Sequence, residues 1–433
     1  MLLLVLAIGC GPWAHSGAPS VPVVNDPHRV PDVNGDGLAD IVVPVRDPDG
    51  GSGERAHVAI FFGPADGTSP PLLVPIDETA LLPSYTTFVG DVDGDGTSDV
   101  VYSEYGVGGS DTPIVLLGGP NGPVADAGVV LANPGGDTEG SRVFRVGDLD
   151  ADGLDDVIVL RSWTLAVHYG GGGIGGAPDV VWQESAMPSW YTPPAGMWTG
   201  QRLGDLLALG DVTGDGRDDV LVWWYGLRDS DNTFIETYAF VIPGPCDGAV
   251  TWIPANDLFP MLPMNHNVEV LSMGDVDGDG LVDLAVSPPT TGAGYSSAGW
   301  VWSEQGVDIT RSSDPVGDLD GDGFGDVVRR GALETLVFSG SLDGFPAAAE
   351  PSWIFPAPDG VDPVNLESWR YGQWGGGVGD VDGDGFDDTI VGSDVDLWLW
   401  HGGPRGGRKK DLGTELFTDY MEPYGVAVRA EAP

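Results

Sequence analysis

The sequence contains almost no lysine. Lys409 and Lys410 are the only two in 433 residues, and all 18 Lys and Arg residues together oppose 66 Asp and Glu residues. The resulting formal net charge of −48 makes the surface repel nucleic acid and anionic lipid and attract cations. We therefore expect no nucleic-acid partner.

Cysteine and catalytic motifs are scarce as well. With only Cys10 and Cys246 in the chain, a disulfide framework is excluded. The six histidines are scattered without the spacing of metal ligands, and the sequence shows neither a nucleophile motif nor a phosphate-binding loop. We therefore expect a protein that is not an enzyme.

Amphipathic helical periodicity is missing along the whole chain. The 69 Gly and 36 Pro residues are typical of many short strands joined by turns. Hydrophobic residues make up 41% of the sequence, which is ample for a large core. The composition therefore predicts an all-β fold.

One short apolar run stands at the start of the sequence. Residues 2–8 are apolar and precede Gly9 and Cys10, which is similar to the end of a bacterial lipoprotein signal. We expect residues 1–20 to be a leader and a short tether, with Cys10 lipidated. The protein would then be exported as an outer-membrane or cell-surface lipoprotein, or otherwise secreted. A lipid on Cys10 would be its only contact with a membrane, and Cys246 would be a small buried hydrophobic residue.

A nine-residue pattern, as in "DVDGDGLVD", occurs seven times. The copies are separated by 59, 57, 63, 64, 43 and 62 residues, so the chain is a repeat protein. The first residues of the seven copies are Asp32, Asp91, Asp148, Asp211, Asp275, Asp318 and Asp380.

Each copy has the donor groups of a calcium loop. Ca²⁺ takes six to eight oxygen ligands, and alternate side chains of a tight loop can surround one ion. The expected side-chain ligands at positions 1, 3, 5 and 9 are Asp32, Asn34, Asp36 and Asp40; Asp91, Asp93, Asp95 and Asp99; Asp148, Asp150, Asp152 and Asp156; Asp211, Thr213, Asp215 and Asp219; Asp275, Asp277, Asp279 and Asp283; Asp318, Asp320, Asp322 and Asp326; and Asp380, Asp382, Asp384 and Asp388. The expected carbonyl ligands at position 7 are Leu38, Thr97, Leu154, Arg217, Leu281, Phe324 and Phe386.

Three copies depart from this pattern. In the first, Asn34 replaces the position-3 aspartate and is itself an oxygen donor. Thr213 is a weaker ligand than aspartate, so the fourth site is expected to be the weakest. Ala151 replaces glycine at position 4 of the third copy, which matters little if that residue has a negative φ. Glycine stands at position 6 of every copy, where it permits the sharp turn that the carbonyl ligand needs.

The residues after the loop predict strands and not the helix of an EF-hand. Position 9 leads into β-branched runs such as "VVYS" and "VIVL", and a later strand ends in a Gly turn, as in "VLLGGPNG". One unit therefore contains four short antiparallel strands in about 60 residues, which is the size of a propeller blade. Either residues 21–24 or the tail at 416–428 would complete the first or last blade.

The unit resembles the FG-GAP or VCBS repeat, which is found in the β-propeller of integrin α-subunits and in bacterial secreted proteins. The resemblance covers residues 25–420 and implies a seven-bladed β-propeller of four-stranded antiparallel blades over residues 21–433, with calcium-binding Asp loops holding up to seven Ca²⁺ ions. Propellers of this kind serve as adhesins, lectins and enzyme accessory domains. The expected function is therefore non-enzymatic recognition of a protein or a glycan at the cell surface.

Two other functions are left open by the sequence, namely a lyase-like polysaccharide-active enzyme and a structural envelope protein. The Asp loops and the Gly turns are expected on one face of the propeller, with the connections between blades on the other. Exposed aromatic rings stack on sugars or receive a partner's side chains, although the same rings can also pack between blades. The candidate ligand-face residues in these connections are Trp190, Tyr191, Trp198, Trp369, Arg370, Tyr371 and Trp374.

Overall fold

The structure is a computed structural model. It describes residues 31–46, 56–64, 69–75, 83–105, 111–124, 128–132, 141–161, 164–183, 202–227, 234–244, 253–254, 269–272, 276, 284–287, 300–301, 313–330, 334–341, 351–356, 374–392, 397–404, 414–417, 421–422 and 425–427. Within these ranges every regular element is a strand, which confirms the all-β prediction. A helix able to cross a membrane is likewise absent from the described residues.

The described strands form seven sheets in the order of the chain. The first sheet contains β1 (Ile41–Arg46), β2 (Ala56–Phe61) and β3 (Leu72–Pro75). The second contains β4 (Pro83–Gly90), β5 (Asp99–Tyr105), β6 (Asp111–Leu116) and β7 (Val129–Val130). The third contains β8 (Ser141–Gly147), β9 (Asp156–Arg161), β10 (Thr164–His168) and β11 (Val180–Gln183).

The remaining four sheets follow the same antiparallel order. The fourth contains β12 (Arg202–Gly210), β13 (Asp219–Leu227), β14 (Phe234–Ile242) and β15 (Ile253–Pro254). The fifth contains β16 (Glu269–Ser272), β17 (Leu284–Ser287) and β18 (Trp300–Val301). The sixth contains β19 (Ser313–Gly317), β20 (Asp326–Arg330), β21 (Glu334–Phe338) and β22 (Trp353–Pro356). The seventh contains β23 (Trp374–Gly379), β24 (Asp388–Gly392), β25 (Leu397–Trp400) and β26 (Thr414–Phe417).

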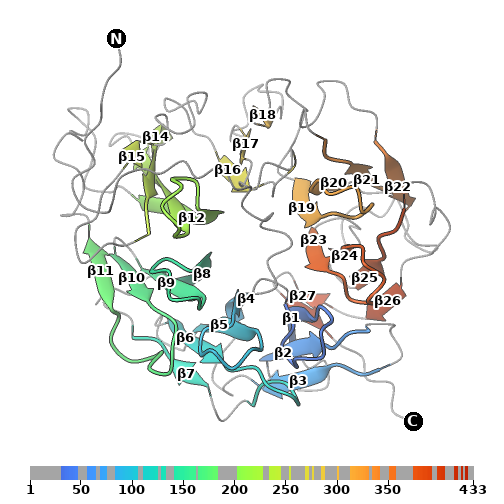
Figure 1. The fold of residues 1–433 in the computed structure, drawn as a ribbon, viewed down its shortest axis with the longest axis horizontal. Helices are drawn as coiled ribbons and strands as arrows, with labels where there is room; N and C mark the ends of the chain where they lie inside the picture. The colour runs from blue at the N-terminus through green and yellow to red at the C-terminus, as the bar shows by residue number, and fades with distance from the viewer. Residues whose placement is uncertain are drawn as a thin grey trace.

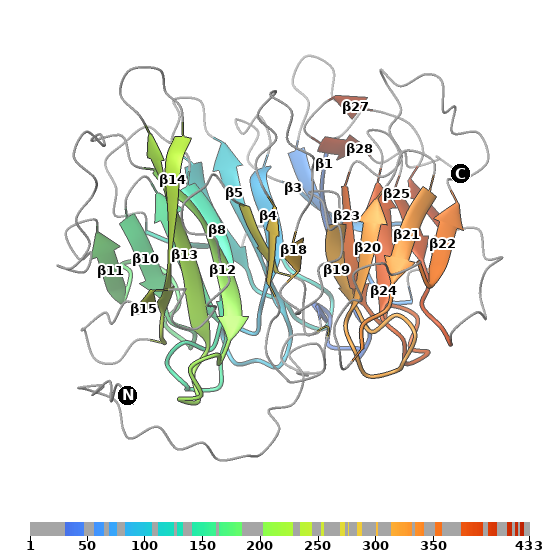
Figure 2. The same cartoon turned by 90° about the horizontal axis from the view of Figure 1, so that it is seen from above.

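The seven sheets follow one another around a common centre in a propeller-like arrangement (Figure 1). The first strands β4, β8, β12, β16, β19 and β23 lie nearest the centre, and the last strands lie at the outside. In the view from above, the loops from β8 to β9, β12 to β13 and β19 to β20 lie at the same edge of the molecule (Figure 2). These loops are copies of the nine-residue pattern, so the fold brings them to one side.

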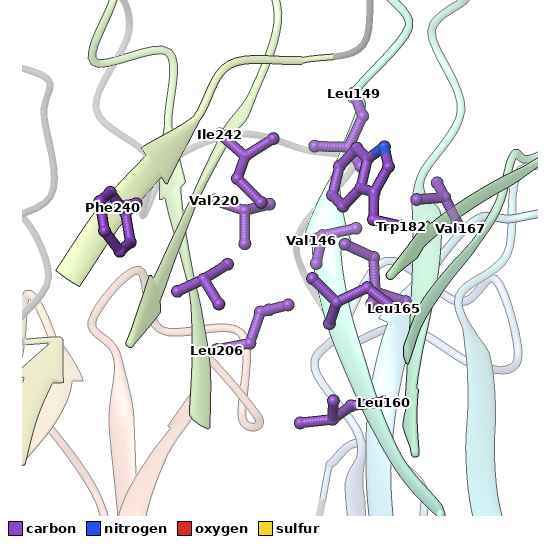
Figure 3. Close-up of a cluster of buried hydrophobic side chains, with 12 residues drawn as sticks. Val146, Leu149, Leu160, Leu165, Val167, Trp182, Leu206, Val220, Phe240 and Ile242 are labelled. Carbon is purple, nitrogen blue, oxygen red and sulfur yellow. The ribbon is translucent and has the colours of Figure 1, made fainter. Parts of the chain in front are cut away.

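The hydrophobic core lies between neighbouring sheets. All six residues of β9 are buried, and alternate side chains point to opposite faces of a strand. Val157 and Val159 pack in a cluster shared with the second sheet, whereas Ile158 and Leu160 pack in a cluster shared with the fourth (Figure 3). A middle strand that is covered on both faces needs an unbroken apolar sequence, which explains runs such as "DVIVLR".

The first and the last sheets also share a cluster. Ala39, Ile41 and Phe61 of the first sheet pack with Val381 and Leu399 of the seventh, which closes the ring. The tail contributes to both sheets, since β26 completes the seventh, and β27 (Met421–Glu422) and β28 (Gly425–Ala427) extend the first. β28 pairs in parallel with β1. The alternative segment, residues 21–24, lies outside the described residues.

Candidate metal centre

In the second, third, fourth, sixth and seventh sheets, the Asp loop closes the hairpin between the first two strands, whereas the first Asp loop directly precedes β1, which pairs in parallel with β28. We number these loops 1 to 7 in chain order, at residues 32–40, 91–99, 148–156, 211–219, 275–283, 318–326 and 380–388. In loop 2, the last strand pair before the loop joins Gly90 to Asp99, next to a bulge. Loops 3, 4, 6 and 7 end on the same glycine–aspartate pair. The aspartate at position 9 is therefore the first residue of the second strand.

The carboxylate at position 1 organises the backbone of the loop. In loop 2, Asp91 Oδ1 accepts hydrogen bonds from the N–H groups of Gly94 at 2.7 Å and Asp95 at 3.1 Å. Its Oδ2 accepts a third bond from Gly96 N–H at 2.9 Å. The bonds from positions 5 and 6 recur in all six loops that the structure describes in full. The loop is therefore folded around this side chain.

The carboxylate at position 9 is fully buried and joins the loop to the Gly turn of its own sheet. Asp99 Oδ2 accepts from Val92 N–H at 2.8 Å, and its Oδ1 accepts from Gly118 N–H at 2.7 Å. Equivalent pairs of bonds hold the position-9 aspartates of the other described loops. The exposed fraction is 0% for Asp40, Asp99, Asp156, Asp219, Asp326 and Asp388.

Burial has a strong electrostatic effect on these side chains. Desolvation raises the pKa of Asp40, Asp99 and Asp219 to about 7, although two backbone N–H bonds act in the opposite direction. The pKa of Asp156 and Asp326 rises to about 8 for the same first reason. The carboxylates at positions 1 and 3 add to the rise of the pKa of Asp99, Asp156 and Asp326, and the position-5 carboxylate adds to that of Asp219. A nearby cation would oppose both causes.

Carboxylate oxygens converge in several of the loops. In loops 2, 3 and 6, one oxygen each from positions 1, 3 and 9 lies within 4.8 Å of the other two. In loop 7, positions 1, 3 and 5 converge in the same way. The backbone N–H of position 7 donates to the position-5 carboxylate in all six described loops, for example from Thr97 to Asp95 at 2.9 Å. The carbonyl ligand at position 7 stays a prediction.

Loop 4 differs at the position where threonine replaces aspartate. Its position-9 side chain, Asp219, accepts from the N–H of Thr213 at position 3, whereas position 2 donates in the other described loops. The hydroxyl of Thr213 also donates to Asp219 at 3.4 Å, and Thr213 is buried. The backbone at the third position is thus turned inward here, and the expectation that this site is the weakest stays a prediction.

Position 4 requires a left-handed backbone. Gly35, Gly94, Gly214, Gly321 and Gly383 have φ between 72° and 81°. Ala151 has φ 64° at the same position, so the condition under which this replacement would matter little is not met. An alanine in this region has its Cβ too close to the backbone, so loop 3 carries strain that the other loops avoid.

Neighbouring loops are hydrogen-bonded to each other. The backbone N–H of position 8 donates to the position-1 carbonyl of the preceding loop, as from Ser98 to Asp32 at 2.7 Å and from Asp155 to Asp91 at 3.1 Å. The same bond runs from Ala39 to Asp380 at 3.0 Å and links loop 1 to loop 7. The residues at position 1 are therefore held from both sides, and the sequence pattern gave no sign of this second role.

Aspartate at position 8 strengthens some of these junctions. Asp218 Oδ2 accepts from Asp148 N–H at 2.9 Å, and Asp387 Oδ2 accepts from Asp318 N–H at 2.7 Å. A Cβ on Gly317 would lie 2.1 Å from the Asp387 carboxylate. The glycine before the loop is therefore required by the close approach of the next sheet as well as by its positive φ.

Loop 7 has a neighbour that the sequence interpretation missed. His401 follows β25, and its Nδ1 lies 3.3 Å from Asp382 Oδ2 and 3.4 Å from Asp388 Oδ2. One donor atom from each of these three residues falls in a single group within 4.8 Å. The contact joins residues 13 and 19 positions apart across a hairpin, so a search for ligands at short spacing could not find it.

Other predicted site residues lie outside the described residues. In loop 5, this holds for Asp275, Asp277, Asp279, Leu281 and Asp283, whereas Val276 is described and buried. It also holds for Cys10 and for the ligand-face candidates Trp190, Tyr191, Trp198, Trp369, Arg370 and Tyr371. Trp374 is the first residue of β23, where it pairs with Gly392.

Comparison with known proteins finds similarity only to solved structures, and that similarity is weak. Neither a protein-family profile nor a curated protein matches the chain. One similar solved structure is BBS1N in complex with ARL6DN, with a TM-score of 0.40 and 11% identity over 91% of this chain and 99% of that one. Another is a putative 6-phosphogluconolactonase from Bacteroides uniformis, with a TM-score of 0.40 and 11% identity over 87% of this chain and 95% of that one. Similarity at this level supports no statement about function.

Proposed function

We propose that this chain is a seven-bladed β-propeller of the FG-GAP or VCBS kind whose Asp loops bind calcium. Each of the seven sheets would be one blade. The observation that carries the proposal is the convergence of three carboxylates in loops 2, 3 and 6, with one of the three fully buried in each loop. A chain gains nothing from grouping buried like charges unless a cation neutralises them.

The chemistry of the loops fits Ca²⁺. The donors are oxygens on a short flexible loop, which is the set that this ion prefers. An ionised carboxylate offers about four lone-pair sites, so Asp99 keeps acceptor capacity for an ion after its two backbone bonds. Bound calcium would supply the positive charge that stabilises the ionised form of the buried aspartates. Position 1 would join the ion to the junction with the following loop, since both of its carboxylate oxygens accept bonds within its own loop and its carbonyl accepts one from position 8 of the following loop.

We infer that calcium serves the scaffold and that recognition takes place elsewhere. The position-8 N–H and the carbonyls of positions 1 and 2 are used in bonds between neighbouring sheets, so we place the partner on the opposite face. The proposed activity is non-enzymatic recognition or adhesion, directed at a protein or a glycan, by an exported protein at the cell surface. The candidate residues for that face are the aromatic residues at 190–198 and 369–374.

Thermal unfolding of the full chain tests the calcium part of the proposal. We expect a higher Tm in millimolar Ca²⁺ than in EGTA, because an ion that binds only the folded state contributes about 2.7 kcal/mol per site at a free concentration of 100 Kd. Isothermal titration gives the number of sites. An unchanged melt after chelation would show that the loops are not metal sites.

A glycan array probed with the full chain, with and without calcium, tests the recognition part. We expect binding that is lost when Trp190 and Trp369 are both replaced by alanine while the Tm in calcium is retained. A calcium-stabilised protein that binds no glycan in either condition would contradict the glycan form of the proposal and leave a protein partner as its remaining form.

A further inference from the structure

In each sheet whose Gly turn the structure describes, the residue before the glycine of that turn lies next to the Asp loop of the same sheet. The N–H of that glycine donates to the buried position-9 carboxylate, which brings the preceding side chain next to the loop. The preceding residues are Phe62, Leu117, Tyr169, Pro243, Ser339 and His401. Sheets 6 and 7 therefore differ from the other described sheets, because only Ser339 and His401 are small or basic polar residues at this place.

These two residues contact equivalent carboxylates. Ser339 Oγ donates to Asp320 Oδ2 at 3.0 Å, and Asp320 is position 3 of loop 6. His401 Nδ1 lies 3.3 Å from Asp382 Oδ2, and Asp382 is position 3 of loop 7. The same Nδ1 also lies 3.4 Å from the buried Asp388 at position 9. Loop 6 thus has an oxygen-only environment, whereas loop 7 adds one nitrogen donor from a separate element.

Two of the three separations between the donor atoms in loop 7 match the spacing of ligands on a small ion. A tetrahedral ion with bonds of about 2.0–2.1 Å holds its ligand atoms about 3.3–3.4 Å apart. The measured separations from Nδ1 to the two carboxylate oxygens are 3.3 Å and 3.4 Å. The carboxylates of Asp380 and Asp384 form a second group with Asp382 within 4.8 Å, so further oxygens are at hand.

Ligand type separates this loop from the others. Calcium is bound through oxygen, whereas an imidazole nitrogen suits zinc and similar transition ions. We propose that loop 7 is a site for a divalent transition ion of the zinc class, held by His401 Nδ1 with the carboxylates of Asp382 and Asp388. The inference rests on the proposed function in one respect, namely that the Asp loops are metal sites. The competing arrangement is a protonated His401 that forms an ion pair with the two carboxylates.

A pair of reciprocal variants tests the site. Zn²⁺ is titrated by calorimetry into the full chain for the natural protein, H401S and S339H, first without added Ca²⁺ and then in saturating Ca²⁺, because Asp382 and Asp388 are also the expected calcium ligands of loop 7. We expect one tight zinc site in the natural chain, at least tenfold weaker binding in H401S, and a new tight site in S339H. Co²⁺ titrations followed by visible absorption should show the same order. Serine is the residue that sheet 6 has at the equivalent position, Ser339, so H401S is expected to fold normally. Its Tm in calcium checks this.

Two outcomes would overturn the inference. Equal zinc affinity in the natural chain and H401S would place any zinc site elsewhere. If H401S fails to fold, ¹⁵N-histidine spectra of the natural chain replace it, and unchanged His401 nitrogen resonances on zinc addition would exclude ligation. Calcium titration in the same samples keeps the proposals apart, since loss of zinc binding with intact calcium binding contradicts only this inference. Zinc binding without any calcium binding contradicts only the proposed function.

Discussion

Loops 2 and 4 have backbone hydrogen bonds in common but differ in the side chain at position 3, which is Asp93 in loop 2 and Thr213 in loop 4. In both, the position-1 aspartate accepts the N–H groups of positions 5 and 6, and the position-9 aspartate is fully buried. Only loop 2 brings positions 1, 3 and 9 together as carboxylates, because Thr213 in loop 4 directs its hydroxyl to Asp219. The hydrogen-bonded backbone of the loop and the convergence of its carboxylates are therefore separable features of one nine-residue pattern.

The pH dependence of stability should reveal the frame that both loops share. The pKa of Asp99 and Asp219 is raised to about 7 in the folded chain, so the folded state binds more protons than the unfolded state above pH 4. The free energy of unfolding in EGTA should therefore fall as the pH rises from 4 to 8. Calcium favours the ionised form and should remove this fall. Urea unfolding at several pH values measures it, and a chelated protein that gains stability over this range would contradict the expectation.

Replacing the position-9 side chain should damage the two loops equally. In D99A the N–H groups of Val92 and Gly118 lose their partner, and in D219A those of Thr213 and Gly244 do. Each buried N–H left without a partner costs about 1–3 kcal/mol, so we expect the two together to lower the free energy of unfolding by about 2–6 kcal/mol in each variant even in EGTA. Chemical unfolding in EGTA compares them. A much smaller loss in D219A would mean that loop 4 does not need the shared frame.

Exchanging the position-3 residues should transfer calcium binding between the loops. We expect D93T to lose one calcium site by titration and about 2–3 kcal/mol of the calcium-dependent stability, a size set by the saturation of one site. T213D should gain a site. The difference in Tm between calcium and EGTA measures the same change. If both exchanges leave the stoichiometry unaltered, position 3 does not decide metal binding.

The smallest expected effect concerns the strain at position 4. A151G should raise the free energy of unfolding by about 1 kcal/mol, because glycine adopts φ near 64° without the penalty that alanine meets. G94A in loop 2 should have the opposite sign, since φ is 81° there and a Cβ would lie 3.3 Å from Leu154. Urea unfolding of the pair is the measurement, and a destabilised A151G would show that a contact of the alanine methyl outweighs the strain.

The loops could be predicted from the sequence because the pattern is local. Aspartate and glycine at fixed short offsets define the turn, and the apolar runs after position 9 define the strands. The bond from Gly118 N–H to the Asp99 carboxylate could not be predicted in the same way, since it spans 19 residues and depends on how β5 and β6 pair. The contact of His401 with Asp382 has the same origin.

The shift in loop 4 could not be predicted for a different reason. The sequence identified Thr213 as a weaker ligand, but not that its N–H would replace that of Val212 at the position-9 carboxylate. Which of the two N–H groups donates depends on the local packing of side chains, and the nine-residue sequence pattern does not specify that packing. The sheets, their order and the Gly positions could thus be predicted from the sequence, whereas the contacts between elements could not.

The bond from Ala39 to Asp380 gives the protein a property that open repeat arrays lack. A linear array has two terminal repeats, which must carry polar caps and which fray first. Where the first sheet is bonded to the last, no repeat is terminal, and loss of any one sheet opens two interfaces at once. Unfolding should therefore be concerted over the whole chain, and a new pair of termini placed at an exposed turn between two strands should be tolerated as well as the natural pair.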